Sequence, residues 1–123
     1  MLEFFDDKKD SGYATLYDRH IVFNSKLIKF FDDAYRVRVA VDKETRKLYV
    51  FMVNKDYALS GEVNESSLLP ISVSKSYVRI SSKSLINFIS NSCEVSPTKE
   101  NSIQCKAIYE DLKKAIVVDL DGE

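Results

Sequence analysis

The architecture of this chain follows from two stretches that resemble each other, ATLYDRHIVFNSK at residues 14–26 and ISVSKSYVRISSK at residues 71–83. They align without a gap, and after one inserted residue the match continues through the next five positions. Few residues are identical, but the apolar positions agree. Because such self-similarity is the sequence signature of a repeated structural unit, we predict two pseudo-twofold copies of one unit, at residues 13–53 and 71–120, joined by a linker at 54–70.

Each copy is predicted to begin with two short strands and a short helix, since its apolar residues first alternate and then crowd one side at helical spacing. The expected strands and helix cover 13–17, 20–23 and 25–32 in the first copy and 71–74, 77–80 and 82–90 in the second. A polar residue stands where each helix begins, Asn24 or Ser25 in the first copy and Ser81 or Ser82 in the second. Such side chains cap a helix by accepting hydrogen bonds from its free backbone N–H groups.

A β-hairpin is predicted to close each copy. Valines alternate with other residues from Val37 to Val41, and a polar turn then leads to an apolar return strand, which is the pattern of a half-buried hairpin. The expected hairpin strands cover 35–41 and 48–53 in the first copy and 103–109 and 115–120 in the second. The linker contains Gly61, Pro70 and several Ser and Asn residues, and a short strand is expected within it at 57–59.

Length and composition agree with one globular domain. The 123 residues are 45% hydrophobic and 30% charged, and a chain of this size can bury enough surface to fold without metal or disulfide bonds. We therefore expect a single α+β domain at residues 1–123 with a mostly antiparallel sheet. No apolar run approaches the roughly 18–20 residues that cross a bilayer, and the first residues are acidic where a signal peptide would be basic, so we expect a cytoplasmic protein without membrane contact.

The sequence contains few residues that could carry chemistry. Cys105 is predicted to be a buried strand residue and Cys93 a loop thiol, without a disulfide between them. With no CxxC pair and a single histidine, His20, neither a zinc site nor a nucleophile–histidine pair is expected. His20 aligns with Tyr77 in the other copy, which favours a packing position, and no glycine-rich phosphate loop occurs. We predict a protein that is not an enzyme and holds no cofactor or metal.

The segment DRHIVFNSKLIKFF at residues 18–31 resembles the strand-into-helix signature of the AbrB-like swapped-hairpin domains, which are bacterial transition-state regulators and antitoxins. The hairpin from Val37 to Val53 resembles the hairpin of that family. The resemblance implies a pseudo-twofold body, here formed by two units in one chain, that holds DNA through Arg and Lys residues. The family's signature glycine and proline positions are Arg19 and Asn24 here, and the second copy keeps few basic residues.

Charge is unevenly distributed along the chain. The whole sequence has a net charge of −1, but the stretch from Arg19 to Lys47 has eight basic and four acidic residues, a local net charge of +4. The basic residues are Arg19, Lys26, Lys29, Arg36, Arg38, Lys43, Arg46 and Lys47. A surface that meets phosphates or an acidic protein is therefore predicted on the first copy. The alternative is that these residues are ordinary solvated charges, some of them paired across the hairpin.

Three functions remain open from the sequence. The first is a non-catalytic interaction protein of a phage or plasmid that binds a host protein or nucleoprotein, as small anti-CRISPR inhibitors do. The chain is small, and it is rich in Lys, Ile and Asn and lacks Trp, a composition that suits a gene of low G+C content. The second is an AbrB-like DNA-binding regulator or antitoxin. The third, least favoured, is an enzyme centred on His20. A homodimer is compatible with the first two.

Overall fold

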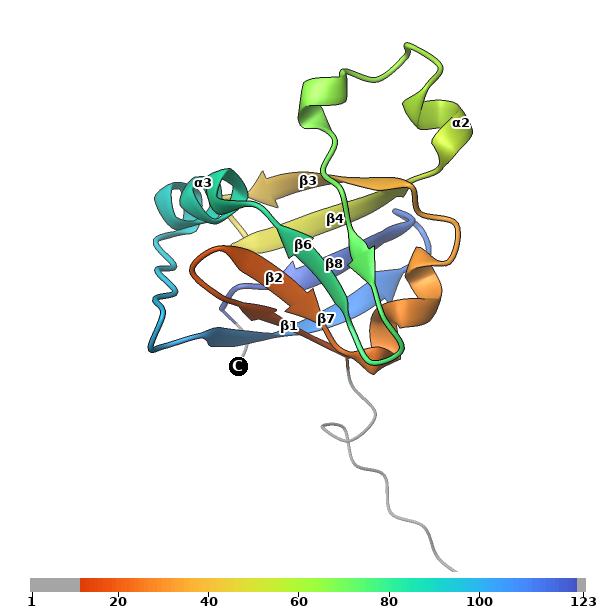
Figure 1. The fold of residues 1–123 in the computed structure, drawn as a ribbon. Helices are drawn as coiled ribbons and strands as arrows, with labels where there is room; N and C mark the ends of the chain where they lie inside the picture. Colours follow the sequence, from red (N-terminus) through yellow and green to blue (C-terminus); the bar gives the residue numbers. More distant parts are fainter. Residues whose placement is uncertain (1–11, 122–123) are drawn as a thin grey trace, which may run out of the picture.

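The structure, a computed structural model, describes residues 12–121, and in it eight strands form one strongly curved, half-barrel sheet (Figure 1). The strands are β1 (Gly12–Leu16), β2 (His20–Phe23), β3 (Arg36–Asp42), β4 (Lys47–Val53), β5 (Ser72–Val73), β6 (Val78–Ser81), β7 (Ile103–Glu110) and β8 (Ala115–Asp119). Their order in the sheet is β3-β4-β8-β7-β1-β2-β6-β5, and all seven neighbouring pairs are antiparallel. The predicted mixed fold with a mostly antiparallel sheet is confirmed.

Four short helical segments accompany the sheet: the 3-10 helix η1 (Ser25–Phe31), α2 (Lys55–Ala58), the 3-10 turn η2 (Glu65–Ser67) and α3 (Lys83–Cys93). The side chain of Ser82 caps α3, because its Oγ accepts a hydrogen bond from the Leu85 N–H at 3.1 Å. Asn24 precedes η1 without a side-chain cap. Helices were predicted at both places, and α3 runs three residues further than expected, to Cys93.

Two expectations about the connecting segments are wrong. The short strand expected at 57–59 is part of the helix α2 and its end, because Asn54 caps that helix by accepting from the Tyr57 N–H at 2.8 Å. Cys93, expected to be a loop thiol, ends α3 and is only 2% exposed. Cys105 is buried in β7, as predicted, and both cysteines are free thiols.

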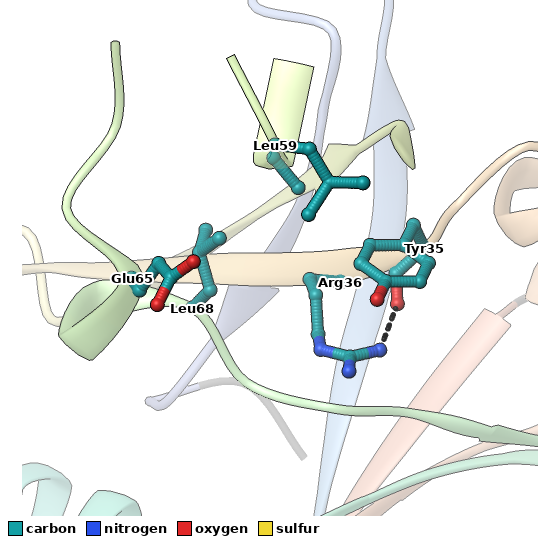
Figure 2. Close-up of a pocket in the computed structure, with 6 residues that line it drawn as sticks. Tyr35, Arg36, Leu59, Glu65 and Leu68 are labelled. Atoms are coloured by element: carbon teal, nitrogen blue, oxygen red, sulfur yellow. Dashed lines mark hydrogen bonds between the residues drawn. The ribbon is translucent and has the colours of Figure 1, made fainter. Parts of the chain in front are cut away.

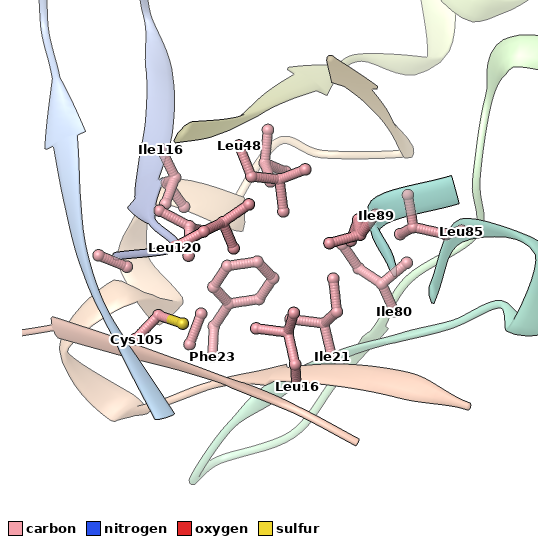
Figure 3. Close-up of a cluster of buried hydrophobic side chains, with 14 of the residues drawn as sticks. Leu16, Ile21, Phe23, Leu48, Ile80, Leu85, Ile89, Cys105, Ile116 and Leu120 are labelled. Atoms are coloured by element: carbon pink, nitrogen blue, oxygen red, sulfur yellow. The ribbon is translucent and has the colours of Figure 1, made fainter. Parts of the chain in front are cut away.

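The core lies inside the curved sheet and is completed by residues of η1 and α3 (Figure 3). Strands β1 and β2 contribute side chains that are fully buried, with Phe23 near the centre of the cluster. Leu27 and Phe31 of η1 pack against it, the rings of Phe23 and Phe31 lying 5.4 Å apart. A large apolar side chain contributes about 1.5–3 kcal/mol when fully buried. The burial of such side chains against the sheet is therefore the main interaction that holds η1 and α3 in place.

A close approach of backbone explains the glycine that begins β1. A Cβ atom on Gly12 would lie 2.7 Å from the carbonyl oxygen of Ala107 and 2.8 Å from the side chain of Leu27. Only glycine therefore lets β1, β7 and η1 meet here without a shift.

The two edges of the sheet are formed by β3 and β5. Strand β5 has two residues, whereas β3 has seven. The segment before β5 returns to β3 at one place, where Val37 and Leu69 exchange two backbone hydrogen bonds of 2.9 and 2.8 Å. The sheet therefore curls until its edges approach, but they are joined by this single bridge among the described residues.

Candidate binding surface

The eight predicted basic residues fall into separate groups along the sheet. Arg19 lies in the β1–β2 turn beside the start of α3, because its carbonyl oxygen accepts from the Ser82 N–H at 3.0 Å. Lys26 and Lys29 belong to η1, which follows the opposite end of β2 (Figure 1). The remaining five lie on β3, in the β3–β4 turn and at the start of β4: Arg36, Arg38, Lys43, Arg46 and Lys47.

Several of these residues lie next to carboxylates. Arg46 forms an ion pair with Asp121, with Nε 2.5 Å from Oδ1. Arg19 lies 4.0 Å from Asp18, and the side chain of Arg19 is largely exposed. In the sheet register Lys47 stands opposite Asp42 on one side and Asp119 on the other. Such exposed pairs add about 0–1 kcal/mol to stability, but they lower the local positive potential that a phosphate would meet.

The β3–β4 turn has its own acidic residue. Asp42 accepts backbone hydrogen bonds from the N–H groups of Glu44 and Thr45, at 3.0 and 3.3 Å. The bond from Thr45 is the main reason that the pKa of Asp42 lies below its ordinary value, because it favours the ionised carboxylate. Asp42 is therefore an anion fixed in place at the end of β3.

A candidate site lies where β3 begins, beneath α2 and η2 (Figure 2). It is a hollow of about 250 Å³ lined by Tyr35, Arg36, Ala58, Leu59, Glu65 and Leu68. Arg36 Nη1 donates a hydrogen bond to the Tyr35 carbonyl oxygen at 2.9 Å, and its guanidinium lies 4.1 Å from the centroid of the Tyr35 ring. The guanidinium is thus held by a cation–π contact and a hydrogen bond at the wall of the hollow.

The roof of this hollow is the segment that was predicted to be a linker, residues 54–70. It is folded into α2 and η2 by two asparagine caps, since the side chain of Asn64 accepts from the Ser66 N–H at 3.0 Å as Asn54 does for α2. Ala58 and Val63 anchor the segment, as both are buried. A capping residue before each short helix is the sequence signal that could have identified it.

Apolar and aromatic side chains are exposed on this roof. Leu59 is 61% exposed and Tyr57 is 40% exposed. Tyr57 joins Tyr35 and Arg36, and Tyr and Arg are enriched among the residues that carry the binding energy of protein–protein interfaces. Leu59 adds exposed apolar area beside them. We call Tyr35, Arg36, Tyr57, Leu59 and Leu68 the crossover surface. Only Arg36 of these five was predicted as a site residue.

A second hollow lies where η1 approaches the end of β4. It has a volume of about 320 Å³ and is lined by Lys29, Phe30, Asp32, Asp33, Ala34, Met52 and Asn54. Phe30 stacks on Tyr109, with centroids 4.2 Å apart and planes at 6°, and the Lys29 ammonium lies 5.2 Å from the Phe30 centroid. Lys29 shares this hollow with two aspartates, so the hollow does not concentrate positive charge.

The one histidine is engaged in packing. The ring of His20 stacks on that of Tyr17, with centroids 4.6 Å apart and planes at 23°. Within residues 12–121 no cluster of three or more His, Cys, Asp or Glu side chains is placed to hold a metal ion. In the same range, no helix has the length and apolar character needed to span a bilayer.

A comparison with family models, curated protein sequences and solved structures finds no match for this chain.

Proposed function

We propose that this protein is a non-catalytic binding protein that recognises a partner protein through the crossover surface. The observation that carries the proposal is the guanidinium of Arg36, which is held in place at the wall of a hollow. The rest of the hollow is lined by Tyr35, Ala58, Leu59, Leu68 and one carboxylate residue, Glu65. Such a site fits a partner that offers a carboxylate to Arg36 and inserts an apolar side chain between Leu59 and Leu68. Because the caps of α2 and η2 fix the roof in advance, little ordering entropy is lost on binding.

The small size of the chain is a feature that it shares with compact inhibitors from phages and plasmids, such as anti-CRISPR proteins, that occupy a surface on a host protein or nucleoprotein. We propose the same mode of action here. The basic residues are divided into separate groups, and Arg19, Arg46 and Lys47 lie beside carboxylates. This arrangement supports protein recognition over AbrB-like DNA binding.

We also infer that the chain is an internal duplication with pseudo-twofold symmetry. Strands that the alignment makes equivalent pair with each other and run antiparallel, β2 with β6 and β4 with β8, as a twofold axis between the copies requires. The predicted hairpins are related by a shift of 68 residues, which places Val50 on Val118. The same shift relates Arg46 and Lys114, which both have a positive φ, 55° and 52°. These correspondences support the duplication.

A capture experiment with matched variants tests the proposed function. The tagged full chain is incubated with bacterial lysate, and the recovered partner is compared between wild type, Arg36→Ala and Leu59→Asp. The control is Phe88→Asp, which places the same charge on an exposed apolar position of α3. We expect the two crossover variants to lose the partner, with affinity reduced about tenfold or more, and the control to retain it.

Two outcomes would overturn the proposal. In one, the crossover variants, shown to be folded by circular dichroism, bind the partner as well as wild type does. In the other, no protein partner is recovered and the chain binds free duplex DNA with an affinity that falls steeply with salt, with a slope of about 0.9 per neutralised phosphate. The second outcome would instead support the DNA-binding regulator.

A further inference from the structure

The outer edge of β3 is open over most of its length. Val37 is bonded to Leu69 on this edge, and among the described residues no other backbone group of β3 has a partner there. Because backbone groups alternate in direction along a strand, the N–H and C=O groups of Val39 and Val41 point to the same edge as those of Val37. A long edge of this kind is a template for another strand unless it is covered.

The side chains at this edge are also incompletely covered. Val39 and Val41 face the core but are only half-buried, whereas Val37 is fully buried. A hollow of about 200 Å³ opens beside the edge, lined by Arg38, Val39, Ala40 and Phe51. Strand β5, the other edge of the sheet, has only two residues and so offers little to a new strand.

We propose that this edge binds the same edge of a second copy of the chain, in an antiparallel pair centred on Ala40. In that register Arg38 of each copy lies opposite Asp42 of the other, so two opposite-charge pairs form on the outer face. Val39 lies opposite Val41 of the second copy on the inner face. Ala40 meets Ala40 on the twofold axis, where a small side chain permits the close spacing of a non-hydrogen-bonded pair.

The register satisfies the open backbone groups. Val39 and Val41 point to the edge in both copies, so each Val39–Val41 pair exchanges two hydrogen bonds and the dimer forms four. The paired segment has natural limits at both ends, since the Leu69 bridge occupies Val37 and the turn begins after Asp42. Five residues about one centre are left, which is the isologous geometry of a twofold dimer. The interface is small, so we expect a weak dimer that depends on concentration.

A single-cysteine cross-link tests the register. In the proposed dimer, the Cα atoms of Ala40 from the two copies lie about 4.5 Å apart, as in other non-hydrogen-bonded pairs, and this distance permits a disulfide. Oxidation of Ala40→Cys with diamide, which takes up the two thiol hydrogens, should therefore give a covalent dimer on non-reducing gels. Wild type, whose two cysteines are buried, and Lys75→Cys, in the β5–β6 turn, are the controls and should stay monomeric. A folded Ala40→Cys variant that cross-links no more than Lys75→Cys would overturn the proposal.

A charge variant tests the same contact without a covalent bond. Arg38→Glu places like charges opposite each other twice per dimer, so the dissociation constant measured by sedimentation velocity should rise by about tenfold or more. Lys75→Glu makes the same change in net charge away from β3 and should leave the dissociation constant unchanged. Wild type that stays monomeric at near-millimolar concentration, or equal effects of the two variants, would refute the dimer. Neither measurement depends on the crossover surface or on its partner.

Discussion

Strands β7 and β3 begin the hairpins of the two predicted copies, but their outer edges are covered very differently. Strand β1 pairs with β7 at five successive positions, from Gly12–Ala107 to Leu16–Ile103. Strand β3 has one bridge to Leu69. The chain that leaves β4 folds into α2 and η2 before it returns to the sheet, so within residues 12–121 no strand covers β3 as β1 covers β7. The segment that contains α2 and η2 thus accounts for both the hollow at Arg36 and the open edge at Val39.

The contrast predicts that the same truncation has different costs on the two sides of the sheet. Val118→Ala should lower the free energy of unfolding by about 2–3 kcal/mol, because Val118 is fully buried between β4 and β7. Val41→Ala, on the half-buried side of β3, should lower it by about 1 kcal/mol or less. Urea denaturation at low protein concentration measures both. Equal losses would mean that the β3 side is packed as tightly as the β7 side.

The helices η1 and α3, which belong to the two predicted copies, also differ, because α3 has a side-chain cap and η1 has none. Ser82→Ala should lower the free energy of unfolding by about 1 kcal/mol, because the Leu85 N–H loses its acceptor. Ser84→Ala, at the exposed second residue of the same helix, is the matched control and should be neutral or slightly stabilising. Thermal unfolding compares the three proteins, and a Ser82→Ala midpoint no lower than the control would show that the cap contributes nothing.

The smallest effect is expected in the hairpin turns and depends on pH. The pKa of Asp42 is lowered in the folded state, so its contribution to stability is present above the ordinary pKa of about 3.8. It is lost as the pH falls through the lower folded value. The difference in thermal midpoint between wild type and Asp42→Asn should therefore shrink from pH 6 towards pH 3. Glu110→Gln, at the matching place before the β7–β8 turn, is the control, and an equal pH dependence in both variants would contradict the assignment.

Local pattern was sufficient to predict most of the elements. The alternation from Val37 to Val41 and the polar residue before each helix predicted the hairpin and helix positions to within a few residues. Pattern failed in residues 54–70, where Gly61 and the polar composition suggested a linker. Two single-turn helices bury too few side chains to produce a periodic signal, and only their asparagine caps mark them.

The site was harder to predict because it joins residues that are distant in the sequence. Arg36 was included in a list based on charge alone, yet its surroundings come from Leu59, Glu65 and Leu68 in the presumed linker. Likewise, the alternation of apolar and polar residues in a strand does not identify the neighbouring strand. The pairing of Lys47 with Asp119 could therefore not be predicted. A charge count along the chain overestimates the positive charge of a surface when neighbouring strands place acidic residues beside the basic ones.

The two buried thiols, Cys93 and Cys105, can report local unfolding of the native protein. Cys93 is the last residue of α3 and Cys105 is the third residue of β7, and neither can react with a thiol reagent in the solvent until its surroundings open. The rate at which each sulfur is modified in the native protein therefore records how often its region opens. For Cys93 this region is the end of α3, and for Cys105 it is strand β7. Modification can be followed residue by residue with mass spectrometry, without introducing any label.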